Sequence, residues 1–235
     1  MNATMTILFI VTSHAMIGHG GEPTGVWFEE LSTPYYAFVD KGYSVRLASI
    51  DGGEIPIDPR SQQEDGSNPP SVERFLKDKV AMDKLHHSAA IENIDPSNFA
   101  AIFLPGGHGT MWDFSKSEVL ASIVSDTLED GRIVAAVCHG PAGLINAKDK
   151  EGNPVVKGKT IAAFTNEEEE AVGLTEKVPF LLESRLRELG ANIQQAPKFE
   201  AIAVRDGNLI TGQNPASSEK VAELVIEALK EQSTE

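Results

Sequence analysis

Short apolar runs alternate along this chain with longer segments of helical periodicity, and this alternation restricts the fold more than any other feature. The apolar runs are Thr6–Val11, Ser44–Ser49, Ala100–Leu104, Ile133–Val137 and Thr160–Phe164. The helical patterns are Trp27–Lys41, Lys79–Ile91, Ser117–Gly131 and Glu167–Gly190. Strands that alternate with helices predict an α/β fold, in which a mostly parallel sheet is covered by helices on both faces.

Three segments depart from this alternation. In AIAVRDGNLITG, two β-like runs flank Asp206-Gly207, which is a strong hairpin signal and predicts an antiparallel addition to the sheet. The last helix is expected to begin near NPASSEK, where Asn214 or a nearby Ser can cap it and Pro215 suits its first turn. Residues 51–78 are rich in Asp, Pro, Ser and Gln, and they predict a long surface excursion.

The composition indicates one acidic globular domain. No linker or sharp change in composition divides the 235 residues, so we expect a single domain over residues 1–235. The formal charge of -15 repels phosphate backbones and anionic membrane surfaces, which argues against nucleic-acid or membrane binding. The N-terminal MTILFIVTS is too short to span a bilayer and lacks a basic n-region. We therefore expect a buried first strand and a cytoplasmic protein.

The only cysteine, Cys138, ends the apolar run IVAAV and is followed by HGPAGL, which is expected to open the next helix. This order predicts a strand-to-helix nucleophile elbow, with Cys where hydrolases of similar architecture often carry Ser. A helix N-terminus favours thiolate over thiol, so we expect a lowered pKa for Cys138. The next residue, His139, would offer its backbone N–H to an oxyanion.

A second glycine-rich stretch is expected beside this elbow. FLPGGHGTMWD places Gly106 to Gly109 at the end of another central strand. Glycines at such a point let backbone N–H groups approach a ligand closely. We therefore expect Gly107 and His108 to contribute to binding the substrate or its oxyanion.

The sequence matches neither the common metal-binding motifs nor a phosphate-binding loop. The chain has no HExxH and no paired cysteines, and His86-His87 has no Cys or carboxylate partner at suitable spacing, so we assign no metal. SHAMIGHGGEPTG does not fit a phosphate loop, because Pro23 replaces the third glycine of GxGxxG and no GK[ST] follows.

The assembled motifs resemble the ThiJ/PfpI superfamily and, within it, the heat-shock, chaperone-like branch that acts as glyoxalase III. They run from the first helix to the last: TGVWFEEL, PGGHGTMWDF, AAVCHGPAGL, FTNEEEEAVGL and TGQNPAS. The resemblance implies a flavodoxin-like three-layer sandwich and a homodimer. It also implies that methylglyoxal, a small reactive dicarbonyl, is converted to lactate through a Cys138 hemithioacetal without glutathione or any other cofactor.

The resemblance further implies the catalytic residues. Cys138 and His139 form the pair at the elbow, Glu30 on the first helix faces the thiol, and an acid within Glu167–Glu170 orients His139. Aligning FTNEEEEAVG on its Phe-Thr start and its terminal Gly favours Glu169, with the neighbouring positions left open.

Helical spacing supports an inward-facing Glu30. Trp27, Leu31 and Pro34 surround it on the first helix, whereas Glu29 projects about 100° away. A carboxyl group so placed, close to a thiolate, is expected to have a raised pKa because burial and like charge both favour its protonated form. Either Glu30 or His139 could then move the proton during the reaction.

The same residues are compatible with other functions to different degrees. Class I glutamine amidotransferases share a Cys elbow but take their base from a histidine well downstream, and no histidine follows His139. A small PfpI-type peptidase or amidase remains an alternative, although no feature marks a peptide-binding groove. Protein deglycation would begin with the same addition to an aldehyde, and a holdase chaperone activity could coexist with catalysis or replace it.

Overall fold

The structure is a computed structural model that describes residues 5–18 and 20–234. Its centre is a seven-stranded sheet of order β3-β2-β1-β4-β5-β9-β8. The strands are β1 (Thr6–Val11), β2 (Ser44–Ser49), β3 (Ala89–Ala90), β4 (Ala101–Leu104), β5 (Ile133–Val137), β8 (Ala203–Asp206) and β9 (Leu209–Gly212). Every neighbouring pair in this sheet is parallel except β8 and β9, which form the expected hairpin around Asp206-Gly207. The predicted α/β fold is confirmed.

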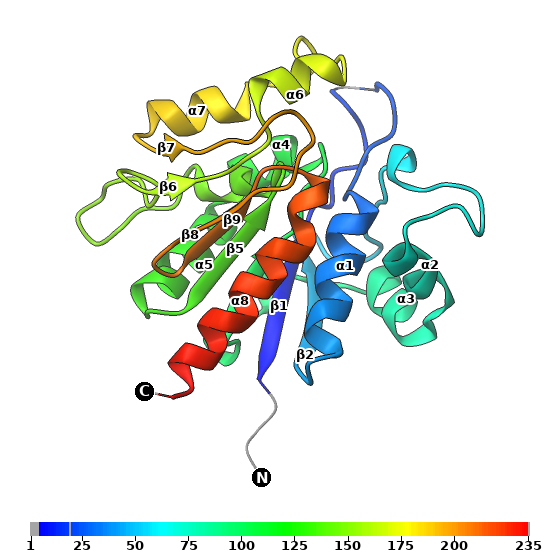
Figure 1. Cartoon of the computed structure of the whole chain (residues 1–235), viewed down its shortest axis with the longest axis horizontal. Coiled ribbons are helices and arrows are strands. Elements are labelled where there is room, and N and C mark those ends of the chain that lie inside the picture. Colours follow the sequence, from blue (N-terminus) through cyan, green and yellow to red (C-terminus); the bar gives the residue numbers. More distant parts are fainter. Residues whose placement is uncertain (1–4, 19, 235) are drawn as a thin grey trace.

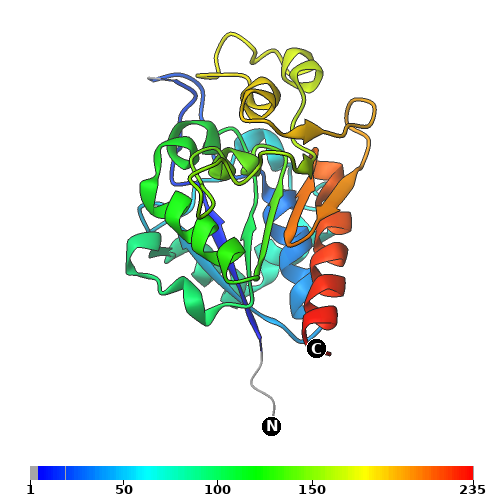
Figure 2. The same cartoon turned by 90° about the vertical axis from the view of Figure 1, so that its left-hand side faces the viewer.

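Helices cover both faces of the sheet because successive strand residues point to opposite sides. In β1, Ile7 and Phe9 join the core under one set of helices, whereas Leu8 and Ile10 join the core on the other side. The first face carries α1 (Phe28–Val39), α2 (Pro70–Lys77), α3 (Lys79–His86) and α8 (Ser218–Gln232). The second carries α4 (Thr110–Asp113) and α5 (Glu118–Glu129). Figure 2 shows the strands between α5 in green and α8 in red.

The region after β5 is more broken than its helical pattern predicted. Only Thr160–Ile161 of the expected fifth strand is extended, as β6, and it pairs with β7 (Asn192–Ile193) in a separate two-stranded sheet. The expected helix Glu167–Gly190 is two helices, α6 (Asn166–Ala171) and α7 (Leu182–Glu188). Gly173, in the left-handed region at φ 73°, ends the first helix. Both helices lie above the carboxyl ends of the parallel strands (Figures 1 and 2).

The helix predicted over Lys79–Ile91 is shorter than expected. Helix α3 ends at His86, and the chain then enters β3. The C-terminal helix begins as predicted. A 3-10 turn, Pro215–Ser217, leads into α8, and Asn214 and Ser217 form a capping box around that turn. No helix among residues 5–18 and 20–234 is long and apolar enough to cross a membrane.

Residues 51–78 are not the surface excursion that their composition predicted. They contain a 3-10 turn, Pro59–Ser61, and helix α2, whose Val72 and Phe75 are fully buried in the core. Asp58 is also fully buried. The polar composition of the segment concealed two apolar residues at helical spacing. The segment places its 3-10 turn at the carboxyl end of the sheet.

Candidate active site

Cys138 sits at a strained elbow directly after β5. Its φ of 62° lies in the left-handed region, which only one other non-glycine residue adopts in the described part of the chain. The conformation is held from both sides, because the Cys138 N–H donates to Gly212 O at 2.9 Å and its carbonyl accepts from the Phe164 N–H at 3.0 Å. Strain of this kind persists only where the surroundings enforce it, and it is common at active sites.

The electrostatics of the thiol differ from the expectation. The segment after the elbow is a short 3-10 helix, Gly140–Leu144, rather than the start of an α-helix. Burial raises the pKa of Cys138, the neighbouring Glu30 raises it further, and the backbone N–H of His139 only partly opposes them. The predicted lowering of this pKa is therefore wrong, and the resting thiol keeps its proton until a base removes it.

His139 is placed to be that base. Its Nδ1 lies 3.3 Å from the Cys138 Sγ, and its Nε2 lies 2.7 Å from Oε2 of Glu169. Of the four consecutive glutamates, Glu169 is thus the one that contacts His139. Glu168 is buried but caps its own helix through Thr165, and Glu167 and Glu170 are exposed.

Glu169 binds a second histidine with its other oxygen. His108 Nε2 lies 2.6 Å from Oε1, so each oxygen of Glu169 accepts from one imidazole. Burial alone would raise the pKa of Glu169, but the two histidines outweigh it and lower that pKa. Burial and the neighbouring His139 lower the pKa of His108 to about 4, so His108 is neutral. A charged Glu169 that accepts from both Nε2–H groups leaves each Nδ1 as an acceptor, which for His139 faces the thiol.

Glu30 approaches the thiol from α1 and is fully buried. The Gly106 N–H donates to its Oε2 at 2.6 Å, while Oε1 is buried without a hydrogen-bond partner among the described residues. Burial raises the pKa of Glu30 to about 8, and the neighbouring Cys138 thiol and the Gly106 N–H offset this only in part. Glu30 is therefore protonated at neutral pH, and Oε1 is the oxygen left to carry the proton.

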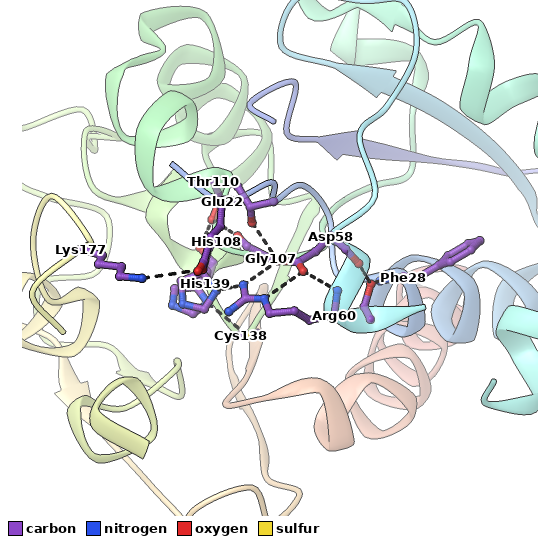
Figure 3. A network of polar contacts seen from close by, with 12 residues as sticks. Glu22, Phe28, Asp58, Arg60, Gly107, His108, Thr110, Cys138, His139 and Lys177 are labelled. Carbon is purple, nitrogen blue, oxygen red and sulfur yellow. Dashed lines mark hydrogen bonds and ion pairs between the residues drawn. The ribbon is translucent and has the colours of Figure 1, made fainter. Parts of the chain in front are cut away.

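The thiol opens into a cavity of about 250 Å³. Figure 3 shows Cys138 beside the His139 and Arg60 side chains. The lining residues of the cavity are Trp27, Arg60, Gly107, His108, Cys138, His139, Phe164, Val172, Phe199 and Pro215. The expected Gly107 and His108 are therefore at the cavity wall. Arg60 was missed in the sequence, because it belongs to the segment expected at the surface. Two larger hollows, of about 480 and 430 Å³, contain neither the thiol nor its partners.

His108, His139 and Glu169 are also the one group in the described chain whose potential ligand atoms lie close enough to hold a metal, within 4.8 Å of one another. The side chains of these three residues already pair in the two histidine–carboxylate hydrogen bonds. A metal bound there would displace the contact that holds His139 toward the thiol. The exposed His86 and His87 belong to no such group among the described residues.

The sequence profile of the DJ-1/PfpI family matches residues 24–228. The chain belongs to the DJ-1/PfpI family. Glyoxalase 3 of Candida albicans is 34% identical, over 89% of this chain and 92% of that protein. The glutathione-independent glyoxalase HSP31 of Saccharomyces cerevisiae is 31% identical, over 97% of this chain and 99% of that protein. The crystal structure of glyoxalase III from Candida albicans matches this fold with a TM-score of 0.86 at 32% identity, covering 95% of this chain and 97% of that one.

The charge state of Glu30 can be tested by alkylating Cys138 with iodoacetamide across pH. Above its pKa of about 8, Glu30 becomes a charged neighbour that opposes thiolate formation. We expect Glu30→Gln to be alkylated on the order of tenfold faster than wild type at pH 9, equivalent to one pKa unit, and to differ little at pH 6. Glu29→Gln, on the half-exposed neighbour, should follow wild type. Identical pH profiles for Glu30→Gln and wild type would contradict the assignment.

The role of Glu169 can be tested in the same way at neutral pH. Glu169→Gln can no longer hold both Nε2–H groups as a charged acceptor, so His139 loses its orientation as the base for the thiol. Iodoacetamide alkylation of Cys138 should slow by about 100-fold, while circular dichroism stays that of the folded protein. The exposed Glu170→Gln is the matched control and should react like wild type. A larger fall of the alkylation rate in Glu170→Gln than in Glu169→Gln would show that Glu169 is not the acid that orients His139.

Proposed function

We propose that this protein is a glutathione-independent glyoxalase that converts methylglyoxal to lactate at Cys138. The observation that carries the proposal is a thiol that opens into a cavity, has Nδ1 of His139 3.3 Å from its Sγ, and contacts the buried, protonated carboxyl group of Glu30. Relatives aligned over most of the chain are named Glyoxalase 3 and glutathione-independent glyoxalase, which supports the same reaction. The family is established independently of this reaction.

The first step is addition of sulfur to the aldehyde carbon. His139 Nδ1 accepts the thiol proton as Sγ bonds to carbon 1, and it then gives that proton to the aldehyde oxygen. The product is a hemithioacetal. The backbone N–H groups of His139 and Gly107 are assigned to the oxyanion that forms during the addition, because both residues line the cavity beside the sulfur.

The second step moves a hydrogen from carbon 1 to carbon 2. His139 removes the proton from carbon 1 while Glu30 donates its proton to the ketone oxygen, which gives an enediol. His139 then protonates carbon 2, and Glu30 recovers a proton from the hydroxyl on carbon 1. The result is a thioester of lactate, with both residues restored. A protonated Glu30 begins this cycle as the acid, so His139 is assigned as the base.

The last step is hydrolysis of the thioester. His139 accepts a proton from water as the water oxygen bonds to carbon 1, and it returns a proton to the departing sulfur. One methylglyoxal and one water give one lactate and one proton, so the proposed steps need only the side chains and water. The cavity of about 250 Å³ lies below the usual range for drug-sized ligands, which favours a small dicarbonyl over a peptide.

The remaining expectations also enter as proposals. A homodimer and accompanying deglycase or holdase activity are what the resemblance implies, and we retain them on that basis, together with the cytoplasmic location expected from the sequence. Deglycation would begin with the same addition of Cys138 to an aldehyde-derived carbon. A chaperone function would survive loss of the thiol, so client-aggregation assays on Cys138→Ala separate it from catalysis.

The proposed function is tested by methylglyoxal turnover with chiral analysis of the lactate. Wild type should consume methylglyoxal and release one lactate enantiomer, because the proton is delivered within an asymmetric cavity. Cys138→Ala should lose about a thousandfold or more of the rate, since the described residues that line the cavity include no other Cys and no Ser, Thr or Lys. The substitution removes one sulfur atom, so cooperative unfolding should persist.

Two results would count against the glyoxalase. One is unchanged turnover by a folded Cys138→Ala. The other is a wild type that leaves methylglyoxal intact but cleaves peptide substrates in a Cys138-dependent manner, which would favour the PfpI-type peptidase.

A further inference from the structure

Arg60 is held rigidly at the wall of the thiol cavity. Its Nε donates to Oδ1 of Asp58 at 3.0 Å and its Nη2 donates to Oδ2 at 2.6 Å, a two-point contact that fixes the plane of the guanidinium. Asp58 is fully buried and also accepts from Thr24 Oγ1 at 2.8 Å. The Arg60 side chain is 36% exposed, yet a fully buried carboxylate holds its guanidinium.

One edge of this guanidinium remains free to bind a ligand. Nη2 also lies 3.2 Å from Nδ1 of His108, which is the acceptor nitrogen because Nε2–H of His108 points to Glu169. Nη1 has no hydrogen-bond partner within residues 5–18 and 20–234. Arg60 lines the same cavity as Cys138. Figure 3 shows Arg60 between Asp58 on one side and the His108 and His139 rings on the other.

The charge of the cavity makes this edge distinctive. Among its described lining residues Arg60 is the only Lys or Arg, and none is Asp or Glu. The other walls are largely apolar, with Trp27, Phe164 and Phe199 among them. A fixed guanidinium with a free Nη1–H in a partly dry cavity forms a stronger, charge-assisted hydrogen bond with a small anion than with a neutral molecule of the same size.

We propose that Arg60 forms a carboxylate subsite in the thiol cavity, which takes small 2-hydroxy or 2-oxo carboxylates. A carboxylate oxygen accepts from Nη1 while the rest of the molecule lies against the apolar wall beside Cys138. The identification of the natural occupant as the lactate product rests on the proposed function, whereas anion binding at Arg60 does not. The subsite makes the carboxylate product an inhibitor that competes for the thiol.

The test compares two alkylating agents that differ in charge but little in size. Iodoacetate carries the carboxylate and iodoacetamide does not, and both can react only with Cys138 among cysteines, because the chain has one. The ratio of the iodoacetate rate to the iodoacetamide rate should fall about tenfold in Arg60→Met, the loss expected for one charge-assisted hydrogen bond. Dividing the two rates removes any general change in the reactivity of the thiol.

Arg74→Met is the matched control. Arg74 also makes a two-point contact with an aspartate, Asp40, but it lies on α2 and does not line the thiol cavity. The ratio should stay at the wild-type value in this variant. An equal fall in both variants would mean that the ratio follows net charge alone, and an unchanged ratio in Arg60→Met would overturn the subsite.

Because Arg60→Met leaves Asp58 as a buried charge, the variant can lose stability. The double variant Asp58→Asn/Arg60→Met removes that charge and should show the same fall in the ratio. A measurement on wild type needs no variant: lactate should protect Cys138 from iodoacetamide, and the neutral lactamide should protect it much less. Equal protection by the two compounds would contradict the proposal.

Methylglyoxal turnover separates this inference from the function on which it partly rests. If wild type does not consume methylglyoxal but the alkylation ratio still depends on Arg60, the subsite stands and the glyoxalase assignment fails. If turnover occurs and the ratio is insensitive to Arg60, the glyoxalase stands and the subsite fails.

Discussion

The hydrogen bond from the Gly106 N–H to Oε2 of Glu30 is the contact on which the site depends. It joins the first turn of α1 to the loop after β4 and brings both against the elbow after β5. The three segments meet so closely that a Cβ at Gly106 would lie 2.6 Å from Oε2 of Glu30 and 2.7 Å from the backbone nitrogen of His139. Only glycine permits this approach, so the carboxyl group reaches the thiol because one side chain is absent.

This packing divides the site into two halves with different protonation. Glu30 and Cys138 are both buried and both keep their protons at rest, because burial outweighs their hydrogen bonds. On the other side, a charged Glu169 orients the two imidazoles. The thiol is therefore not a preformed thiolate. In the proposed mechanism, His139 Nδ1 removes its proton as the substrate binds, and Glu30 supplies the acid for the next step.

Sequence patterns predicted the parts of this structure that are determined by residues close together in the sequence. The parallel strands follow from apolar runs, and the elbow at Cys138 follows from a strand that ends in a Cys-His-Gly-Pro sequence. The pKa of Cys138 was mispredicted because burial is set by distant packing, which outweighed the helix terminus assumed from HGPAGL. Arg60 was missed because its position depends on the buried Asp58, whose long-range contact with Thr24 leaves no local signal.

The central claim is that Glu30 holds a proton beside the thiol at neutral pH. Infrared difference spectroscopy between wild type and Glu30→Gln at pH 7 tests it directly, because a carboxylic acid and a carboxylate absorb at different frequencies. A protonated Glu30 predicts that the variant loses a carboxylic acid C=O band, and that this band titrates away in wild type near pH 8. Loss of carboxylate bands alone at pH 7 would contradict it.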